Sequence, residues 1–352
     1  MMKFGIPWIA MFTAVPLVVG FSLTALGTLY LIGWLRDRQL GKTIRDDVEH
    51  HAGKAGTPTM GGLVLVGLVL LVTATASVLV YSLASYMSGV DDEPGLLNTL
   101  VGESTMLLIV FVTLLLATVA FGALGLLDDW KGLARKGMAR EIGVGLTARQ
   151  MLLIQVLFAV AIAYALSPIT VVSSPNRSFG RMPGPPIDVV DSGAAAFLQL
   201  PSSVVSAVGI AGWIAIATLV IVGTVNGVNL SDGLDGLAAG LAATAFLAYG
   251  LVVLRLSKAT HWISDLPTLI NWPTAVAALC MFIAGCCLGF LMLNRYPARF
   301  FMGNVTSMAL GGALATIALA TGTWPLLPVI GIVYVAEVAS DIIQVGDFKW
   351  SG

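Results

Sequence analysis

Long apolar stretches recur along the whole chain and constrain its fold more than any other feature. A stretch of about 20 apolar residues in hydrocarbon must form a helix or belong to a closed barrel, because unpaired backbone groups are too costly there. Barrel strands are shorter and alternate polar with apolar residues, which these stretches do not. The sequence therefore predicts an all-α polytopic transmembrane helix bundle. Its nine expected spans lie at about 8–35, 61–86, 104–127, 151–172, 205–226, 236–256, 272–293, 304–321 and 326–345.

The composition supports lipid as the main solvent of the chain. Hydrophobic residues make up 57% of the sequence and charged residues 11%, far from the average of a soluble domain. The first span is too long for the core of a secretory signal, so we expect it to be retained. Cys280, Cys286 and Cys287 share one apolar span, which indicates neither a disulfide framework nor a zinc site. No basic stripe indicates a nucleic-acid partner.

The polar connections between the spans differ in charge. One alternating set, at 36–60, 128–150, 227–235, 294–303 and the C-terminal end, holds 13 of the 18 lysines and arginines. By the positive-inside rule this set is cytoplasmic and the N-terminus lies outside. The same connections carry the segments GTPTMGG, LLDDWK, NGVNLSDGLDG and NRYPARFFMG. We therefore expect them to converge on one site at the cytoplasmic interface.

Acidic and amide residues in two of these connections suit phosphate and metal chemistry. Asp128 and Asp129 are adjacent at the end of a span, and neighbouring helical residues point about 100° apart, which favours separate roles. The segment NGVNLSDGLDG provides a second set, of amide and carboxylate oxygens, and such oxygen ligands suit Mg²⁺. A solvated helix end and a structural or calcium-type turn are the alternative interpretations. The members of the second set lie three residues apart and would share a face of a helical turn: Asn226, Asn229, Asp232 and Asp235.

Two other connections offer groups for a nucleotide. Lys54 precedes GTPTMGG, where a lysine before a helix N-terminus suits phosphate, although a plain glycine-rich helix start is the alternative. NRYPARFFMG offers Asn294 to hydrogen-bond and Phe301 to stack on a base, although an interfacial aromatic and arginine anchor is the alternative. Glu337 and Asp341 lie four residues apart in the last span and face one way. Contact with the site and an internal partner both stay open for them.

The motifs, in this order, resemble the MraY family of phospho-N-acetylmuramoyl-pentapeptide transferases, in the polyprenyl-phosphate N-acetylhexosamine-1-phosphate transferase superfamily (glycosyltransferase family 4). The resemblance runs from TIRDD at 43–47 to IIQVGDFKWSG at 342–352. IRDD, GTPTMGG and QVGxFK are more particular to this family than the aspartate pair and NxxNxxDGxDGLA. The resemblance implies transfer of phospho-MurNAc-pentapeptide from UDP-MurNAc-pentapeptide to undecaprenyl phosphate, giving lipid I and UMP. It implies a multi-pass protein of a bacterial inner (plasma) membrane, with peptidoglycan synthesis as its role.

The resemblance also implies roles for single residues. Asp128 and Asp129 match the aspartate pair that deprotonates or orients the lipid phosphate, and Asp232 matches the essential loop aspartate, so these three are the expected catalytic residues. Attack by an aspartate and direct attack by the lipid phosphate both stay open. The expected ligands of the Mg²⁺ cofactor are Asp232 and Asn304. The expected substrate-binding residues are Lys54, Lys136, Arg149, Asn226, Asn229, Gly233, Asp235, Asn294 and Phe301.

Two features depart from the family pattern. The family motif FMGDxGS reads FMGNVTS at 301–307, so Asn304 replaces an aspartate ligand and Thr306 replaces a glycine. An amide oxygen coordinates Mg²⁺ without contributing charge, so the affinity for the ion should fall. The chain also ends at Gly352, before the His-rich loop and tenth span of the family. We expect one integral-membrane transferase domain over 1–352 without them.

Other functions and assemblies stay open at this point. A sibling enzyme that transfers another UDP-HexNAc phosphate would share most of the motifs, and a donor screen separates it. A non-catalytic membrane scaffold would tolerate Asn304. A transporter would carry its polar groups near the middle of the membrane rather than along one face. A homodimer is kept as an expected form of association.

The charge asymmetry predicts that the connections around Lys54, Asp129, Asp235 and Asn294 share the cytoplasmic side. In a cysteine-free background, single cysteines placed beside these residues should resist a membrane-impermeant maleimide in intact cells and react after permeabilisation. A cysteine in the acidic segment 91–93, on the opposite side, should react in intact cells and is the control. Strong labelling of any of the four in intact cells would contradict a shared site.

Overall fold

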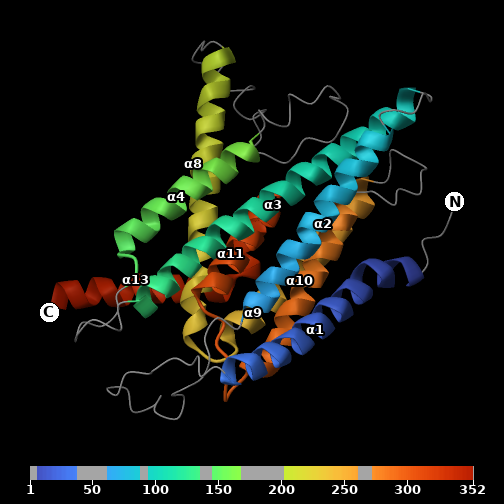
Figure 1. Ribbon diagram of the computed structural model, residues 1–352. Coiled ribbons are helices and arrows are strands. Elements are labelled where there is room, and N and C mark those ends of the chain that lie inside the picture. The colour runs from blue at the N-terminus through green and yellow to red at the C-terminus, as the bar shows by residue number, and fades with distance from the viewer. Residues whose placement is uncertain are drawn as a thin grey trace.

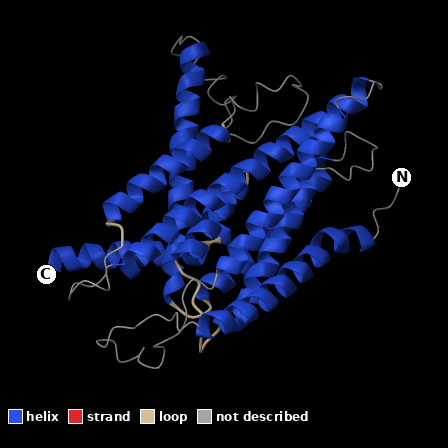
Figure 2. Cartoon of the chain, in the orientation of Figure 1, coloured by secondary structure: helices blue, strands red, loops and turns tan. Residues whose placement is uncertain are grey.

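The computed structural model of the chain is a bundle of helices (Figure 2). It describes residues 6–37, 62–87, 94–134, 145–167, 202–260 and 272–351. Short 3-10 turns occur at Ser231–Gly233 and Trp324–Leu326. The predicted all-α class is confirmed for the part of the chain that the structure describes. The helices are α1 (Ile6–Asp37), α2 (Leu63–Met87), α3 (Pro94–Ala134), α4 (Ala148–Ala165), α8 (Ser202–Leu230), α9 (Leu237–Thr260), α10 (Trp272–Asn294), α11 (Asn304–Ala320), α12 (Leu327–Ile330) and α13 (Ile332–Ser351).

Seven of the described helices are long and apolar enough to cross a membrane: α1, α2, α3, α4, α8, α9 and α10. Each matches a predicted span, and the chain is a polytopic membrane protein. The span predicted at 326–345 is bent: the helix breaks at Gly331, where Trp324–Ile330 meets Ile332–Asp347 at 76°, and the length and composition of this bent pair allow it as an eighth span. Gly331 lies at the break, and glycine disfavours the interior of a helix. The span predicted at 304–321 is α11, with 17 residues.

Helix α11 lies at the centre of the bundle. All of its residues from Val305 to Ala320 are buried, and α3 and α8 pack along it. Gly311 lies against the backbone of Val225 in α8, and Gly312 lies against the ring of Phe121 in α3. Small residues allow this close approach, which supplies the van der Waals contact that holds helices together in lipid.

Helices α1 and α10 form the closest of the peripheral contacts. Gly285 lies against the backbone of Leu17 and Gly289 against that of Phe21, so neither position has room for a Cβ. The three cysteines on α10 are free and buried within the bundle. They therefore face neighbouring helices rather than lipid.

The outer faces of the bundle are apolar. Leu26 of α1, Leu79 of α2, Leu153 of α4 and Leu219 of α8 are each more than 60% exposed. Exposed leucines on several neighbouring helices are typical of surfaces that face lipid. The apolar outer surface and the long apolar helices thus both indicate that a lipid bilayer surrounds the bundle.

The helix ends that flank the predicted polar connections lie together. Figure 1 shows the C-terminal ends of α1, α3, α8 and α10 at the lower end of the bundle, beside the N-terminal ends of α2, α4, α9 and α11. The common end is the arrangement that the alternating charges predicted. Its placement on the cytoplasmic side stays a prediction.

The contact between α1 and α10 predicts a selective effect of a single methyl group. Gly285→Ala should destabilise the bundle by about 1–3 kcal/mol, because its Cβ would overlap the Leu17 backbone. Gly67→Ala is the matched control, since a Cβ at Gly67 has no neighbour within 4 Å. In detergent, the thermal midpoint of Gly285→Ala should fall, and that of Gly67→Ala should stay near the value of the natural chain. Equal midpoints would contradict the close packing.

Candidate functional site

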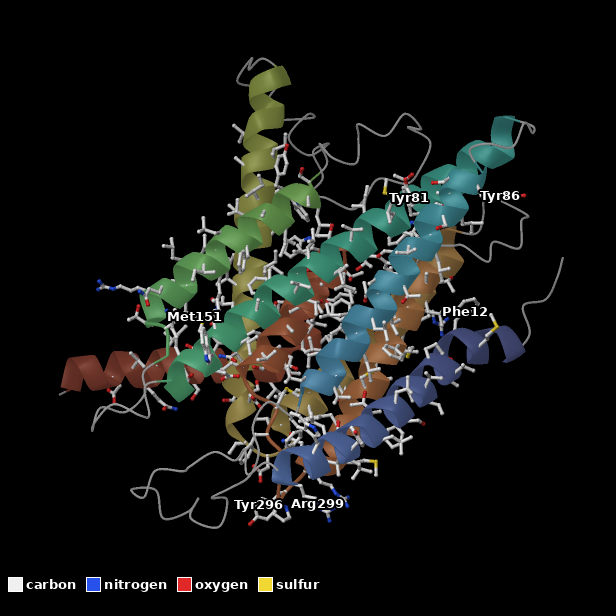
Figure 3. The ribbon with its side chains drawn as sticks, in the orientation of Figure 1. Phe12, Tyr81, Tyr86, Met151, Tyr296 and Arg299 are labelled. Carbon is white, nitrogen blue, oxygen red and sulfur yellow. The ribbon has the colours of Figure 1, made fainter. Side chains whose placement is uncertain are left out.

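Three polar connections meet at the lower end of the bundle. They are the described residues 145–147 just before α4, the turn between α8 and α9, and the loop between α10 and α11. Figure 3 labels Tyr296 and Arg299, which project from this loop at that end. The connections are joined by side-chain hydrogen bonds described below. We name this region the site face and define it by Asp128, Asp129, Asp232, Asp235, Asn294 and Asn304.

Asp128 connects three elements of the site face. Its Oδ1 accepts a hydrogen bond from the backbone N–H of Leu146 at 2.7 Å, just before α4. Its Oδ2 accepts one from the Nδ2 of Asn304 at 2.7 Å, at the start of α11. Gly125, one turn earlier in α3, lies directly against the backbone of Asn304. The close approach of α3 to α11 thus brings the two side chains within reach.

Asp232 fixes the loop that leads into α11. It lies in the 3-10 turn after α8, with φ −78° and ψ 16°. Its Oδ2 accepts a hydrogen bond from the backbone N–H of Gly303 at 3.0 Å. Gly303 has a φ of +82°, a conformation that glycine adopts without steric cost. The loop aspartate and the start of α11 are therefore held as one unit.

Asn294 and Asp235 brace the loop between α10 and α11. The Oδ1 of Asn294 accepts a hydrogen bond from the N–H of Gly236 at 3.1 Å, and its Nδ2 donates to the carbonyl of Phe300 at 2.8 Å. The Asn294 side chain is only 3% exposed. Asp235 accepts a hydrogen bond from the N–H of Ala298 at 3.0 Å. Both side chains thus shape the loop, and their predicted contact with a nucleoside stays a prediction.

The two asparagines of α8 face different neighbours from the aspartates that follow. Asn226 forms a reciprocal amide pair with Gln155 of α4, with N–O distances of 2.8 and 3.3 Å. Asn229 accepts a hydrogen bond from the Oγ of Ser307 at 2.7 Å. Helix α8 ends at Leu230, so the helical face predicted for all four residues does not extend to Asp235. The backbone turns there to reach α9.

Gln155 is the residue that sequence reasoning missed. It is 1% exposed within the apolar helix α4, and its amide holds Asn226 in the opposite helix. A single amide in an otherwise apolar span is costly in lipid unless it is paired. That cost was a signal in the sequence, but the sequence does not say which residue pairs with it.

The remaining predicted residues differ in accessibility. Lys54 and Lys136 lie outside the described residues. Arg149 is exposed on the first turn of α4, where the side chain of Thr147 caps the helix through a capping box with Gln150. The cap at Thr147 fixes the start of α4, and Leu146 next to it is bonded to Asp128. The position of Arg149 is therefore tied to that of Asp128.

Two residues beside the site face leave room for a ligand. Phe301 is half-buried, whereas its neighbour Phe300 is fully buried, so of these two rings Phe301 is the one with surface for stacking. Gly233 is exposed, and a Cβ there would have no neighbour within 4 Å. The turn around Gly233 therefore borders open space.

Glu337 and Asp341 lie on α13 beside the site face. Both are half-buried. Helix α13 packs on α8, where Tyr334 and Val338 lie against Gly227. The acidic pair thus lies on a helix that packs on α8 near Gly227. Contact with the site and an internal partner both stay open for Glu337 and Asp341.

The described site residues do not make a metal centre. Across residues 6–351, with the gaps stated above, no group of three or more His, Cys, Asp or Glu side chains is placed to hold a metal ion. The Nδ2 of Asn304, a donor that cannot ligate a cation, lies 2.7 Å from the Oδ2 of Asp128. The Asp128–Asn304 pair thus does not fit an ion between its two side chains, and Asp232 and Asn304 as ligands of Mg²⁺ stay a prediction.

Comparison with known proteins gives consistent findings. A sequence profile described as glycosyl transferase family 4 matches residues 111–322, and residues 54–66 match signature 1 of phospho-N-acetylmuramoyl-pentapeptide-transferase. A relative of that name from Heliobacterium modesticaldum is 35% identical, over 92% of this chain and 79% of the relative. One from Chloroflexus aurantiacus is 36% identical, over 92% and 73%. One from Geobacillus sp. is 32% identical, over 96% and 83%.

The bracing role of Asn294 predicts a loss of stability that needs no ligand. Asn294→Ala should destabilise the protein by about 1–3 kcal/mol, because it leaves the half-buried N–H of Gly236 and the buried carbonyl of Phe300 unpaired. Arg295→Ala, a change at the exposed neighbouring residue, should leave the thermal midpoint nearly unchanged. Both are measured in detergent without nucleotide. An unchanged midpoint for Asn294→Ala, with weaker nucleotide binding, would show that Asn294 serves the ligand instead.

Proposed function

The chain belongs to the phospho-N-acetylmuramoyl-pentapeptide-transferase family within glycosyl transferase family 4, and on this premise we propose which reaction it performs. It transfers phospho-MurNAc-pentapeptide from UDP-MurNAc-pentapeptide to undecaprenyl phosphate, giving lipid I and UMP. The observation that carries the proposal is the site face, where hydrogen bonds join three distant connections at one end of an apolar bundle.

The location of the site face suits the two substrates. An oxygen of the lipid phosphate attacks the phosphorus that bears the sugar; one P–O bond forms, and the P–O bond to UMP breaks. Both reactants are anionic, so the reaction depends on positioning and on stabilising charge. A polar face at the end of a membrane bundle lies next to the lipid phosphate and also to the aqueous nucleotide. The charge asymmetry supports the cytoplasmic side of a bacterial inner membrane for it.

The three aspartates have different surroundings and are assigned different roles. Asp128 already accepts two hydrogen bonds, which supports a positioning role for it. Asp129 points about 100° away around the helix and is assigned to orient or deprotonate the lipid phosphate. Asp232 accepts a hydrogen bond from the backbone N–H of Gly303, just before α11. It is assigned to position the reacting phosphates.

The nucleotide is assigned to the turn and loop beside these aspartates. Phe301 offers its ring to the base, and Gly233 borders the open space that the base would enter. The exposed guanidinium of Arg149, with Lys54 and Lys136, is assigned to the phosphates. Mg²⁺ is the cofactor that the family implies. The Asp128–Asn304 pair does not fit an ion between its side chains, so no step is assigned to Mg²⁺.

The donor distinguishes this proposal from a sibling transferase. The signature over residues 54–66 favours UDP-MurNAc-pentapeptide over other UDP-HexNAc donors. We therefore predict by calorimetry that UDP-MurNAc-pentapeptide binds more tightly than UDP-GlcNAc. Gly233→Leu should weaken this binding by at least roughly tenfold, about 1.4 kcal/mol, because a side chain there would fill the space for the base.

Gly212→Leu is the matched control for this substitution. A Cβ at Gly212 also has no neighbour within 4 Å, but the residue lies on α8 about 30 Å from Gly233 by helical rise. It should leave nucleotide binding unchanged. Tighter binding of UDP-GlcNAc would identify a sibling enzyme. Donor binding without release of UMP on addition of undecaprenyl phosphate would identify a non-catalytic scaffold.

A further inference from the structure

The contact between Asp128 and Asn304 joins α3 to α11 at the site face. We propose that the Asn304 side-chain amide does here what a divalent cation does between two carboxylates, so that the site face of this chain assembles without Mg²⁺. The inference takes from the proposed function only the identity of the cation. It needs no substrate, and its test is independent of the transfer reaction.

The chemistry of the pair fixes the orientation of the amide. An ionised carboxylate has acceptors only, so a neighbouring amide must turn its nitrogen toward it. The 2.7 Å distance from the Nδ2 of Asn304 to the Oδ2 of Asp128 is that of a strong, charge-assisted hydrogen bond. The other oxygen of Asp128 is taken by the N–H of Leu146. Each oxygen thus has a donor from the protein itself.

Backbone packing prevents the pair from separating. Gly125, one turn before Asp128, lies directly against the backbone carbonyl of Asn304 and the N–H of Val305. The preceding turn of α3 repeats the contact: a Cβ added to Gly122 would lie 3.7 Å from the carbonyl oxygen of Val305. Any side chain at position 304 is therefore held opposite Asp128. An aspartate there would place two carboxylates face to face.

The start of α11 offers a favourable position for one acidic side chain. Asn304 is the first residue of α11, and its N-cap, Gly303, has no side chain to cap the helix. The positive end of the helix dipole favours a nearby anion. One carboxylate with an amide donor suits this position, whereas a second carboxylate would add repulsion that a bound cation must offset.

The test exchanges the two residues. In Asp128→Asn with Asn304→Asp, the new amide at 128 has an oxygen for the N–H of Leu146 and a nitrogen for the carboxylate at 304. Both hydrogen bonds of the natural pair are therefore retained. The bond from Leu146 keeps its direction, and in the bond between residues 128 and 304 the donor and the acceptor change places. Asn304→Asp alone loses the amide donor and keeps both carboxylates.

The thermal midpoints of the full chain and both variants are compared in detergent, with EDTA and with increasing MgCl₂. We expect the natural chain and the exchanged variant to have midpoints that Mg²⁺ leaves unchanged. Asn304→Asp should melt roughly 5 °C lower in EDTA, and Mg²⁺ should restore its midpoint. If that variant is recovered only with Mg²⁺, recovery of the exchanged variant in EDTA supports the proposal equally.

Three results would overturn the proposal. One is a natural chain whose midpoint rises with Mg²⁺ as much as that of Asn304→Asp. Another is Asn304→Asp being as stable as the natural chain in EDTA. The third is an exchanged variant that requires Mg²⁺. None of these depends on whether UDP-MurNAc-pentapeptide binds, so failure of this inference is distinguishable from failure of the proposed function.

Discussion

The close approach of α11 to its neighbours is the contact on which the site depends. Gly311 and Gly125 let the backbones of α8 and α3 touch α11. In lipid, helices gain little from burying apolar surface against one another, so such van der Waals contact sets their positions. Because α11 begins at the site face, its depth in the bundle also decides where Gly303 and Asn304 lie. The packing of an apolar helix thus positions polar groups at its end.

Hydrogen bonds then convert that position into a defined polar face. Asp128 accepts a hydrogen bond from the backbone N–H of Leu146 before α4, and Asp232 and Asp235 each accept one from the loop between α10 and α11. The latter two carboxylates brace the backbone of the loop whose apolar residues Phe300 and Met302 are buried in the bundle. The three aspartates cannot be treated as free ligands, because part of their acceptor capacity is already used.

The amide at 304 fits this pattern of internal satisfaction. A face built around facing carboxylates depends on an ion, whereas a carboxylate opposite an amide is satisfied by the protein. Helix α13 extends the face along α8, where the break at Gly331 turns it by 76° from α12. Apolar residues of α13 after the bend, including Ile342 and Ile343, are exposed.

The sequence alone determined the fold class, the approximate spans and the residues that gather at one end. Span length and hydropathy suffice for this, because lipid permits few backbone arrangements. The polar types in LLDDWK and NGVNLSDGLDG also indicated phosphate chemistry before any geometry was known. Only the tertiary structure decided which partner each residue has. The pairing of Gln155 with Asn226, the bracing by Asn294 and the bend at Gly331 depend on contacts between segments far apart in the chain. Periodicity and composition describe one helix at a time, so they carry no information about such contacts.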